Sequence, residues 1–242
     1  MAARKVVRFA CKLPKFGNSP EECEDDFSSA ASCLAVADGA SEACYSQIWA
    51  SILVRSFCTV GDPITWQATE FFAWLEDCRR QWSDWERGLA EKELPWFTRE
   101  KLRLGSFATF LGVSIKEDTW RAFACGDSCL FVVRNDGLTE SFPIPQSHLF
   151  DNTPALVSTA NPPLADHLEI RDGQILSGDS LYLTSDALAN WFLAEHENGE
   201  KPWIALDRIR TPEGFEMFVS QERQNRAMRN DDVTLISLKI AD

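Results

Sequence analysis

The sequence predicts an α+β domain, because helical and strand patterns occupy separate stretches of the 242-residue chain. Apolar residues recur at three- and four-residue spacing between Ser41 and Gly61 and again over residues 65–88, which is typical of two amphipathic helices packed as a hairpin. Short apolar segments crowd together over residues 105–134, which is typical of an antiparallel meander. No repeat, linker or change of composition marks a boundary, so we expect one domain over residues 1–242.

The other expected elements are read from the same periodicities. Strands are predicted at residues 3–10, 33–37, 180–185 and 233–240, and helices near 186–196, 203–209 and 213–227. Residues 143–178 contain five prolines and few periodic positions, which predicts an irregular, flap-like region. Long structured loops of this kind often carry function.

Composition excludes several classes of protein. Apolar residues make up 45% and charged residues 25% of the chain, the ordinary balance of a globular protein. No apolar run approaches the roughly 20 residues that cross a bilayer, and the N-terminus lacks the continuous apolar core of a secretion signal. We therefore expect a soluble, cytoplasmic protein without a membrane partner. A net charge of −13 repels phosphate backbones and disfavours nucleic-acid binding.

Residue types often found at sites give little guidance. The eight cysteines are expected to be mainly reduced core thiols, and Cys125 and Cys129 lack a second pair at zinc-site spacing. Five of the nine tryptophans lie between residues 66 and 96, where helical spacing favours core packing over a ligand cage. With three histidines and none of the common hydrolase or nucleotide-binding motifs, histidine-based catalysis has few candidates.

Acidic residues recur where apolar strands begin or end. They are Glu24, Asp25, Asp26, Asp38, Asp127, Asp186, Asp231 and Asp232. Each aspartate alone could be a turn residue or a helix N-cap. If the strands share a sheet, however, several carboxylates would lie close enough to raise one another's pKa. Mg²⁺ or Mn²⁺, which take oxygen ligands, would remove that repulsion.

Six segments, in this order, resemble motifs of the type 2C (PPM) metal-dependent protein serine/threonine phosphatases. They are EDDF (24–27), VADGAS (36–41), GSFATF (105–110), GDSCLFVVRNDG (126–137), LTSDAL (183–188) and NDDVTLI (230–236). The resemblance, to bacterial single-domain members, covers residues 24–236. It implies a four-layer α-β-β-α sandwich, in which two antiparallel sheets lie face to face between helical pairs, with a two-metal centre at one edge.

The resemblance also implies ligands for the two metal ions. Asp38 would bridge both ions, and the carbonyl oxygen of Gly39 would ligate one of them. Asp186 and Asp231 would complete the shell of the other ion. With Asp25, the three aspartates Asp38, Asp186 and Asp231 would form the catalytic set.

Two further acidic positions match the family pattern. Glu24 and Asp25 match an acidic pair, of which Glu24 would act through bound water and Asp25 would lie near the metals. Asp127 matches a position that helps to hold a weaker, third ion in similar bacterial enzymes, although a turn residue explains it equally well. The implied reaction has no covalent intermediate, because water activated by the metals attacks phosphorus directly.

The chain departs from the family pattern at several positions. Pro20 stands near the place of an arginine that grips the substrate phosphate, so Lys15 or Lys12 would be its substitute and phosphate affinity would be lower. Ala40 replaces a histidine of eukaryotic relatives, and Ala187 replaces a glycine next to Asp186. The carboxylates are all retained, which favours a working enzyme.

We therefore expect hydrolysis of phosphoserine and phosphothreonine in proteins, with a phosphorylated protein as substrate and a cognate serine/threonine kinase system. Two alternatives stay open. A regulatory pseudophosphatase would bind a phosphoprotein or partner with little or no turnover, and an acid-rich metal enzyme would act on small phosphate esters or phosphodiesters.

Overall fold

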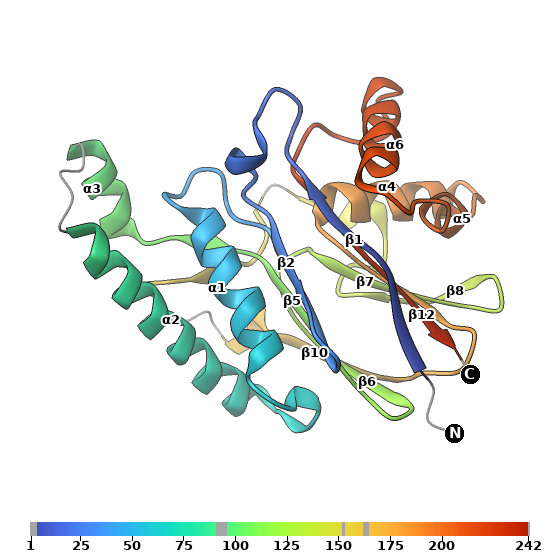
Figure 1. The fold of residues 1–242 in the computed structure, drawn as a ribbon, viewed down its shortest axis with the longest axis horizontal. Helices are drawn as coiled ribbons and strands as arrows, with labels where there is room; N and C mark the ends of the chain where they lie inside the picture. The colour runs from blue at the N-terminus through green and yellow to red at the C-terminus, as the bar shows by residue number, and fades with distance from the viewer. Residues whose placement is uncertain (1–3, 91–95, 152, 162–164, 242) are drawn as a thin grey trace.

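Two antiparallel sheets lie face to face at the centre of the computed structural model, and helices cover their outer faces (Figure 1). The structure describes residues 4–90, 96–151, 153–161 and 165–241. Within these residues, helices α1 and α2 lie on one outer face and α4 to α6 on the other. The predicted four-layer α+β sandwich is therefore confirmed.

The first sheet has the strand order β1-β12-β11-β7-β8. Its strands are β1 (Arg4–Leu13), β7 (Cys129–Arg134), β8 (Gly137–Phe142), β11 (Ser180–Thr184) and β12 (Val233–Ala241). Strand β1 pairs with β12 from Arg4 opposite Ala241 to Leu13 opposite Val233. This register brings the segment after β1 next to the acidic residues that precede β12.

The second sheet has the strand order β10-β6-β5-β3-β2. Its strands are β2 (Asp26–Ser29), β3 (Cys33–Ala37), β5 (Phe110–Lys116), β6 (Thr119–Cys125) and β10 (Glu169–Gln174). A short ribbon of β4 (Phe107–Ala108) and β9 (Val157–Ser158) lies beside it. Asp26 pairs with Ala37, so the acidic start of β2 lies next to the end of β3.

Six α-helices flank the sheets in the described part of the chain. They are α1 (Ser46–Thr59), α2 (Ala68–Ala90), α3 (Trp96–Leu104), α4 (Asp186–Glu197), α5 (Pro202–Leu206) and α6 (Pro212–Gln224). Single 3₁₀ turns occur at Pro20–Glu22, Pro63–Thr65, Ser147–Leu149 and Ala165–His167. A search of the described residues finds no helix with the length and apolar character needed to cross a bilayer.

Alternation along the central strands divides the apolar side chains among three cores. In β3, Leu34 and Val36 point between the sheets, whereas Cys33, Ala35 and Ala37 point toward α1 and α2. Residues of β7 alternate in the same way, because successive strand side chains face opposite sides of a sheet. Both faces of these strands are buried, which explains why their sequences are continuous apolar runs.

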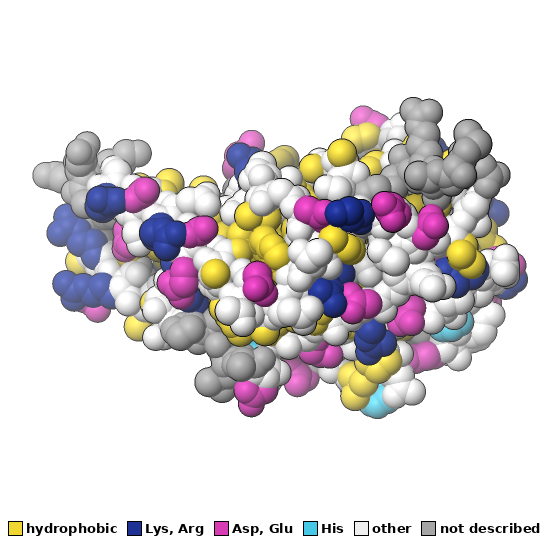
Figure 2. Space-filling model, turned by 90° about the horizontal axis from the view of Figure 1, so that it is seen from below, with side chains coloured by type: hydrophobic (Ala, Val, Ile, Leu, Met, Phe, Trp, Pro, Cys, Tyr) yellow, Lys and Arg dark blue, Asp and Glu magenta, His cyan; other side chains and the backbone are white. Residues whose placement is uncertain are grey.

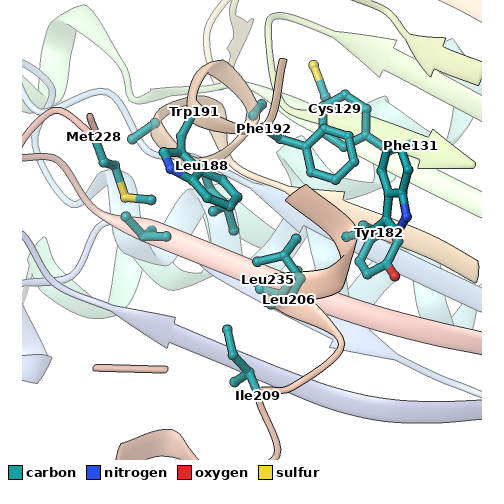
Figure 3. Close-up of a cluster of buried hydrophobic side chains, with 14 of the residues drawn as sticks. Cys129, Phe131, Tyr182, Leu188, Trp191, Phe192, Leu206, Ile209, Met228 and Leu235 are labelled. Carbon is teal, nitrogen blue, oxygen red and sulfur yellow. The ribbon is translucent and has the colours of Figure 1, made fainter. Parts of the chain in front are cut away.

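The core between the first sheet and helices α4 to α6 is rich in aromatic side chains. Figure 3 shows Phe131 and Tyr182 of the sheet on the side of Phe192 of α4, and Trp191 of the same helix on the side of Met228. The rings of Phe131 and Phe192 stack with their centroids 4.1 Å apart. Burial of such large apolar side chains stabilises the position of α4, whose first residue is Asp186.

The predicted core residues behave largely as expected. Trp74 and Trp82, both in α2, are buried, and Trp66 and Trp85 pack against the same core. Trp96, in contrast, is 77% exposed. Cys125 and Cys129 are buried. Burial raises the pKa of the Cys125 thiol to about 12, so these residues are core thiols and poor metal ligands.

Two sequence-based boundaries need correction, and one helix was not predicted. Helix α1 begins at Ser46 and not at Ser41, because Tyr45 has a left-handed backbone with φ 59°. Part of the predicted irregular region 143–178 is regular, since residues 169–174 form β10 and pair with β6. This edge strand lacks apolar alternation, so its sequence gives no strand signal. The sequence also gave no indication of α3.

Candidate metal centre

Five acidic segments meet at one edge of the sandwich, where strands of both sheets end. Asp25 precedes β2 and Asp38 follows β3, and these strands are paired. In the first sheet, Thr184 pairs with both Cys129 and Leu235, which places the segments containing Asp127, Asp186 and Asp231 at the same end of that sheet. The convergence follows from strand register and not from proximity in the sequence.

Asp25 and Asp38 form a close pair of carboxyl groups. They lie near enough to share a hydrogen bond, and Asp25 is completely buried. Burial raises the pKa of Asp25 to about 7, with a further contribution from the charge of Asp232. The pKa of Asp38 is also raised well above its ordinary value, by burial and then by the charges of Asp25 and Asp127. Both groups therefore favour a bound proton or another cation.

Asp25 also connects the two sheets. Its Oδ2 accepts a hydrogen bond of 2.7 Å from the hydroxyl of Thr234 in β12, and its Oδ1 is buried without a partner. Ser185 Oγ in turn accepts the amide of Thr234 at 2.9 Å. The carboxylate thus has a fixed orientation and one oxygen available to a ligand.

Gly39 allows the chain to pass between Glu24 and helix α1. Its amide donates to the carbonyl oxygen of Glu24 at 3.2 Å. A Cβ at this position would lie 2.8 Å from both that oxygen and Ser46 Cβ, so a side chain does not fit here. The close approach keeps the acidic segment before β2 and the loop after Asp38 in fixed contact.

Glu24 is held by polar side chains on three sides. Its carboxylate accepts hydrogen bonds from the hydroxyls of Ser41 and Ser46, the latter at 2.8 Å. Lys15 Nζ lies 3.5 Å from Glu24 Oε2 and donates to Ser41 Oγ at 3.1 Å. Ser41, expected to cap a helix, is instead part of this polar group.

Asp186 and Asp231 share a basic partner that the sequence did not indicate. The Arg229 guanidinium forms an ion pair with Asp186 Oδ2, and its Nε lies 3.4 Å from Asp231 Oδ2. The second oxygen of Asp186, Oδ1, is buried and has no partner. Arg229 therefore pairs with two of the predicted metal ligands and offsets one of their two negative charges, and no local motif distinguishes it from other arginines.

Asp127 lies in the turn between β6 and β7 and is 5% exposed. Burial raises its pKa to about 6, while the charge of Arg229 acts in the opposite direction. Its Oδ1 is buried without a hydrogen-bond partner. A turn residue alone would face solvent, so the buried and unpartnered oxygen distinguishes Asp127 from an ordinary turn former.

Asp232 binds backbone amides, whereas the adjacent Asp231 is paired with Arg229. The two carboxylate oxygens of Asp232 accept the backbone amides of Lys15 at 2.7 Å and Glu24 at 2.6 Å. These bonds hold the segment after β1 and the segment before β2 against the start of β12. The acidic doublet was visible in the sequence, but the partners of its second residue became evident only from the structure.

The two lysines considered as phosphate ligands differ in availability. Lys12 Nζ donates to the carbonyl oxygen of Asp25 at 2.6 Å and lies 3.1 Å from Asp26 Oδ1. Lys15 extends to the edge of the acidic group, where burial lowers its pKa but the charges of Glu24, Asp232 and Asp231 together raise it above its ordinary value. Lys15 therefore remains protonated, and its Nζ contacts the side chains of Glu24 and Ser41 whereas that of Lys12 is bonded to a backbone carbonyl.

The donor chemistry of this edge suits a hard divalent cation. Asp25, Asp127 and Asp186 each have one buried carboxylate oxygen without a partner. Within the described residues, however, no three acidic, histidine or cysteine side chains surround a single point as metal ligands do. Asp186 and Asp231 are instead paired with Arg229. The residues thus fit a metal in type and charge, with Arg229 as the cation between two of them.

Comparison with known proteins agrees with the fold. A model of the family "Protein phosphatase 2C" matches residues 18–226. A search among curated proteins gives no match.

Several solved structures of bacterial phosphatases share the architecture. The catalytic domain of the serine/threonine phosphatase PstP, in complex with two manganese ions, has a TM-score of 0.65 at 16% identity, covering 100% of this chain and 99% of that one. PppA of Pseudomonas aeruginosa gives 0.62 at 18% identity, with 99% of each chain covered. Stp1 of Staphylococcus aureus gives 0.64 at 14% identity, covering 100% and 98%. At these identities the similarity is one of fold.

Proposed function

Because the chain belongs to the protein phosphatase 2C family, we propose that it hydrolyses phosphoserine and phosphothreonine in proteins with the help of two divalent cations. The observation that supports this most strongly is the group of buried carboxylates, three of which have unpartnered oxygens. Negative charges crowded in this way need a cation. The manganese ions of the PstP structure support the same choice of metal class.

The residues that would hold the cations are the ones that the sequence singled out. We assign Asp38 and the Gly39 carbonyl to one ion, with Asp38, Asp186 and Asp231 for the other. Asp25 would lie beside them, Glu24 would act through water, and Asp127 would serve a third, weaker ion. Mg²⁺ or Mn²⁺ would supply charge to the phosphoryl oxygens and lower the pKa of the attacking water.

The chain itself would position the reactants. Water attacks phosphorus in line, the bond from phosphorus to the serine or threonine oxygen breaks, and the leaving oxygen takes up a proton. Lys15 would attract the phosphate as a point charge, without the two-pronged contact of an arginine. The contact of Lys15 with Glu24 limits this role, so weak phosphate binding is expected.

The reaction is tested with p-nitrophenyl phosphate and a phosphothreonine peptide in the presence and absence of Mn²⁺. We expect metal-dependent release of phosphate, and a loss of at least about a hundredfold in Asp38→Asn, since that variant removes a central charge without changing shape. Equal rates for Asp38→Asn and the parent would contradict the proposal. A panel of small phosphate esters and phosphodiesters would identify the wider substrate class.

A regulatory pseudophosphatase is the second candidate. It is favoured by the ion pairs of Arg229 with Asp186 and Asp231 and by the proline at residue 20, where the family places an arginine. Calorimetry separates the two proposals. Binding of Mn²⁺ and of a phosphopeptide, with no phosphate released over a long incubation, would support the pseudophosphatase. Either function requires a phosphoprotein partner and, with it, a serine/threonine kinase.

A further inference from the structure

An apolar pocket opens next to Asp38, between the loop after β3 and the end of α3. It has a volume of about 530 Å³ and includes Asp38 and Thr109 in its wall. The apolar side chains that line it are Ala40, Ala43, Leu104, Phe107, Pro154 and Leu156. The pocket, named here the α3 pocket, is therefore continuous with the candidate metal centre.

Hydrogen bonds fix the floor of the α3 pocket relative to Asp38. The amide of Ala40 donates to the carbonyl oxygen of Phe107 at 3.0 Å. The amide of Thr109 donates to the carbonyl oxygen of Asp38 at 2.8 Å, and the Asp38 amide donates to Thr109 Oγ1 at 3.3 Å. A group bound in the pocket would thus lie at a defined distance from the reacting phosphate.

Leu104 forms an apolar rim that is 70% exposed. It is the last residue of α3, and Gly105 ends the helix with φ 83°. A Cβ on Gly105 would lie 2.8 Å from Thr159 Oγ1, so the helix end is closely packed against the segment after β9. Covering an exposed leucine with another apolar group is favourable, because apolar surface is removed from water.

The α3 pocket and a second pocket near the candidate centre differ in the charge of their lining residues. Besides Asp38, the charged residues that line the α3 pocket are Glu42 and Lys101, which have opposite signs, and Lys101 Nζ lies 3.4 Å from the Glu42 carbonyl oxygen. The second pocket, which shares Pro154 with the first, is lined by Asp127, Asp151, Asp166 and Glu169. A peptide bound at the centre would therefore meet an apolar hollow that includes Asp38 and an acidic one that includes Asp127.

We propose that the α3 pocket binds an apolar side chain of the phosphoprotein substrate, within two residues of the phosphorylated serine or threonine. The inference rests on the proposed phosphatase function and adds a sequence preference to it. Continuity with Asp38, the apolar lining and the opposite charges of Glu42 and Lys101 together select an aliphatic or aromatic residue. Hydrophobic pockets of this kind discriminate between side chains by about tenfold or more.

The test compares phosphothreonine peptides in which leucine replaces glycine singly at each of the two positions on either side. We expect leucine at one position to raise kcat/KM about tenfold. In Leu104→Asp this gain is lost, measured as the ratio of kcat/KM for the leucine and glycine peptides. Leu104→Ala reduces the ratio less. Met217→Asp, which places the same charge at a residue that is 74% exposed on α6, is the matched control and keeps the full ratio.

Outcomes for the pocket and for the reaction are separable. Absence of p-nitrophenyl phosphate hydrolysis would contradict the proposed function, and binding of the same peptides to Asp38→Asn, followed by fluorescence anisotropy, would still test the pocket. The inference is overturned if leucine at none of the four positions raises kcat/KM. It is also overturned if a preference for leucine persists in Leu104→Asp. A dimer that Leu104→Asp dissociates, together with no preference for leucine, would assign the surface to a second copy of the chain and likewise overturn it.

Discussion

The Asp25–Asp38 pair and the Asp186–Asp231 pair lie at the same edge of the sandwich but balance their charge differently. Asp25 and Asp38 are next to each other, and both have raised pKa values. Asp186 and Asp231 are both paired with the single guanidinium of Arg229. Without metal, one pair thus depends on protons and the other on a guanidinium. No ion pair links a described basic side chain to the first pair, whereas a metal ion would have to compete with Arg229 for the second.

Elsewhere on the molecule, acidic groups are balanced in a more ordinary way. Figure 2 views the face opposite the start of β2, where acidic and basic side chains are interspersed with apolar ones. Exposed pairs such as Lys116 with Asp62 are typical of the periphery and contribute little to stability. The unusual electrostatics of the protein are therefore concentrated at the candidate centre and do not follow from the net charge of −13.

The largest expected contrast between the two pairs is in stability. Asp25→Asn removes a buried charge while keeping an oxygen for the Thr234 hydroxyl, so we expect the metal-free protein to gain about 1–3 kcal/mol at pH 8 and to lose activity. Asp186→Asn removes a partner of Arg229 and should lower the free energy of unfolding by about 0.5–1 kcal/mol. Urea denaturation measures both. Changes of the same sign would remove the proposed difference.

The pH dependence of stability sharpens the same comparison. Asp25 and Asp127 have folded-state pKa values of about 7 and about 6, above the ordinary 3.8, so the folded protein holds protons that the unfolded chain has lost. The free energy of unfolding of the metal-free protein should therefore fall as pH rises from about 5 to about 7. Exposed carboxylates with lowered pKa, such as Asp172, act only below about pH 4.

Metal should reverse this trend, because a bound cation displaces the protons. Calorimetric titration with Mn²⁺ at pH 6, in buffers of different ionisation enthalpy, should show proton release, which Asp25→Asn reduces. Stability that rises with pH in the metal-free protein, or metal binding without proton release, would contradict the assignment of the raised pKa values.

The smallest expected effect concerns Arg229. If its guanidinium competes with a cation for Asp186 and Asp231, Arg229→Gln should tighten Mn²⁺ binding about three- to tenfold, equivalent to about 1 kcal/mol. Arg226→Gln, the same substitution at an exposed residue of the same segment, is the control for the loss of one positive charge. Weaker Mn²⁺ binding in Arg229→Gln would indicate that the arginine supports the centre instead of competing for it.

Local patterns were sufficient for much of the fold. Strands such as β3 and β7 were recognisable because burial on both faces makes them continuously apolar. The edge strand β10 was missed because most of its side chains are exposed and follow no apolar pattern. Helix α1 starts later than predicted because Ser41 bonds to Glu24, a residue of another segment, in place of capping the helix.

The acidic residues of the candidate centre were recognisable for a similar reason, since strand ends followed by aspartate recur along the chain. Their grouping depends on strand order, which the sequence supplied only through the family resemblance. The pairing of Arg229 and the backbone contacts of Asp232 depend on tertiary structure alone. No property of either residue's neighbours in the sequence distinguishes those partners.

The acidic edge draws its side chains from two separate sheets, with Asp25 and Asp38 on one and Asp186 and Asp231 on the other. The distance between these groups is consequently governed by the layer of leucine, valine and isoleucine that keeps the sheets apart. A bulkier residue at Leu183 or Val36, both of which belong to that layer, would widen or tilt that separation. Cation selectivity in this protein would then be adjustable from its hydrophobic interior, without altering a single ligand.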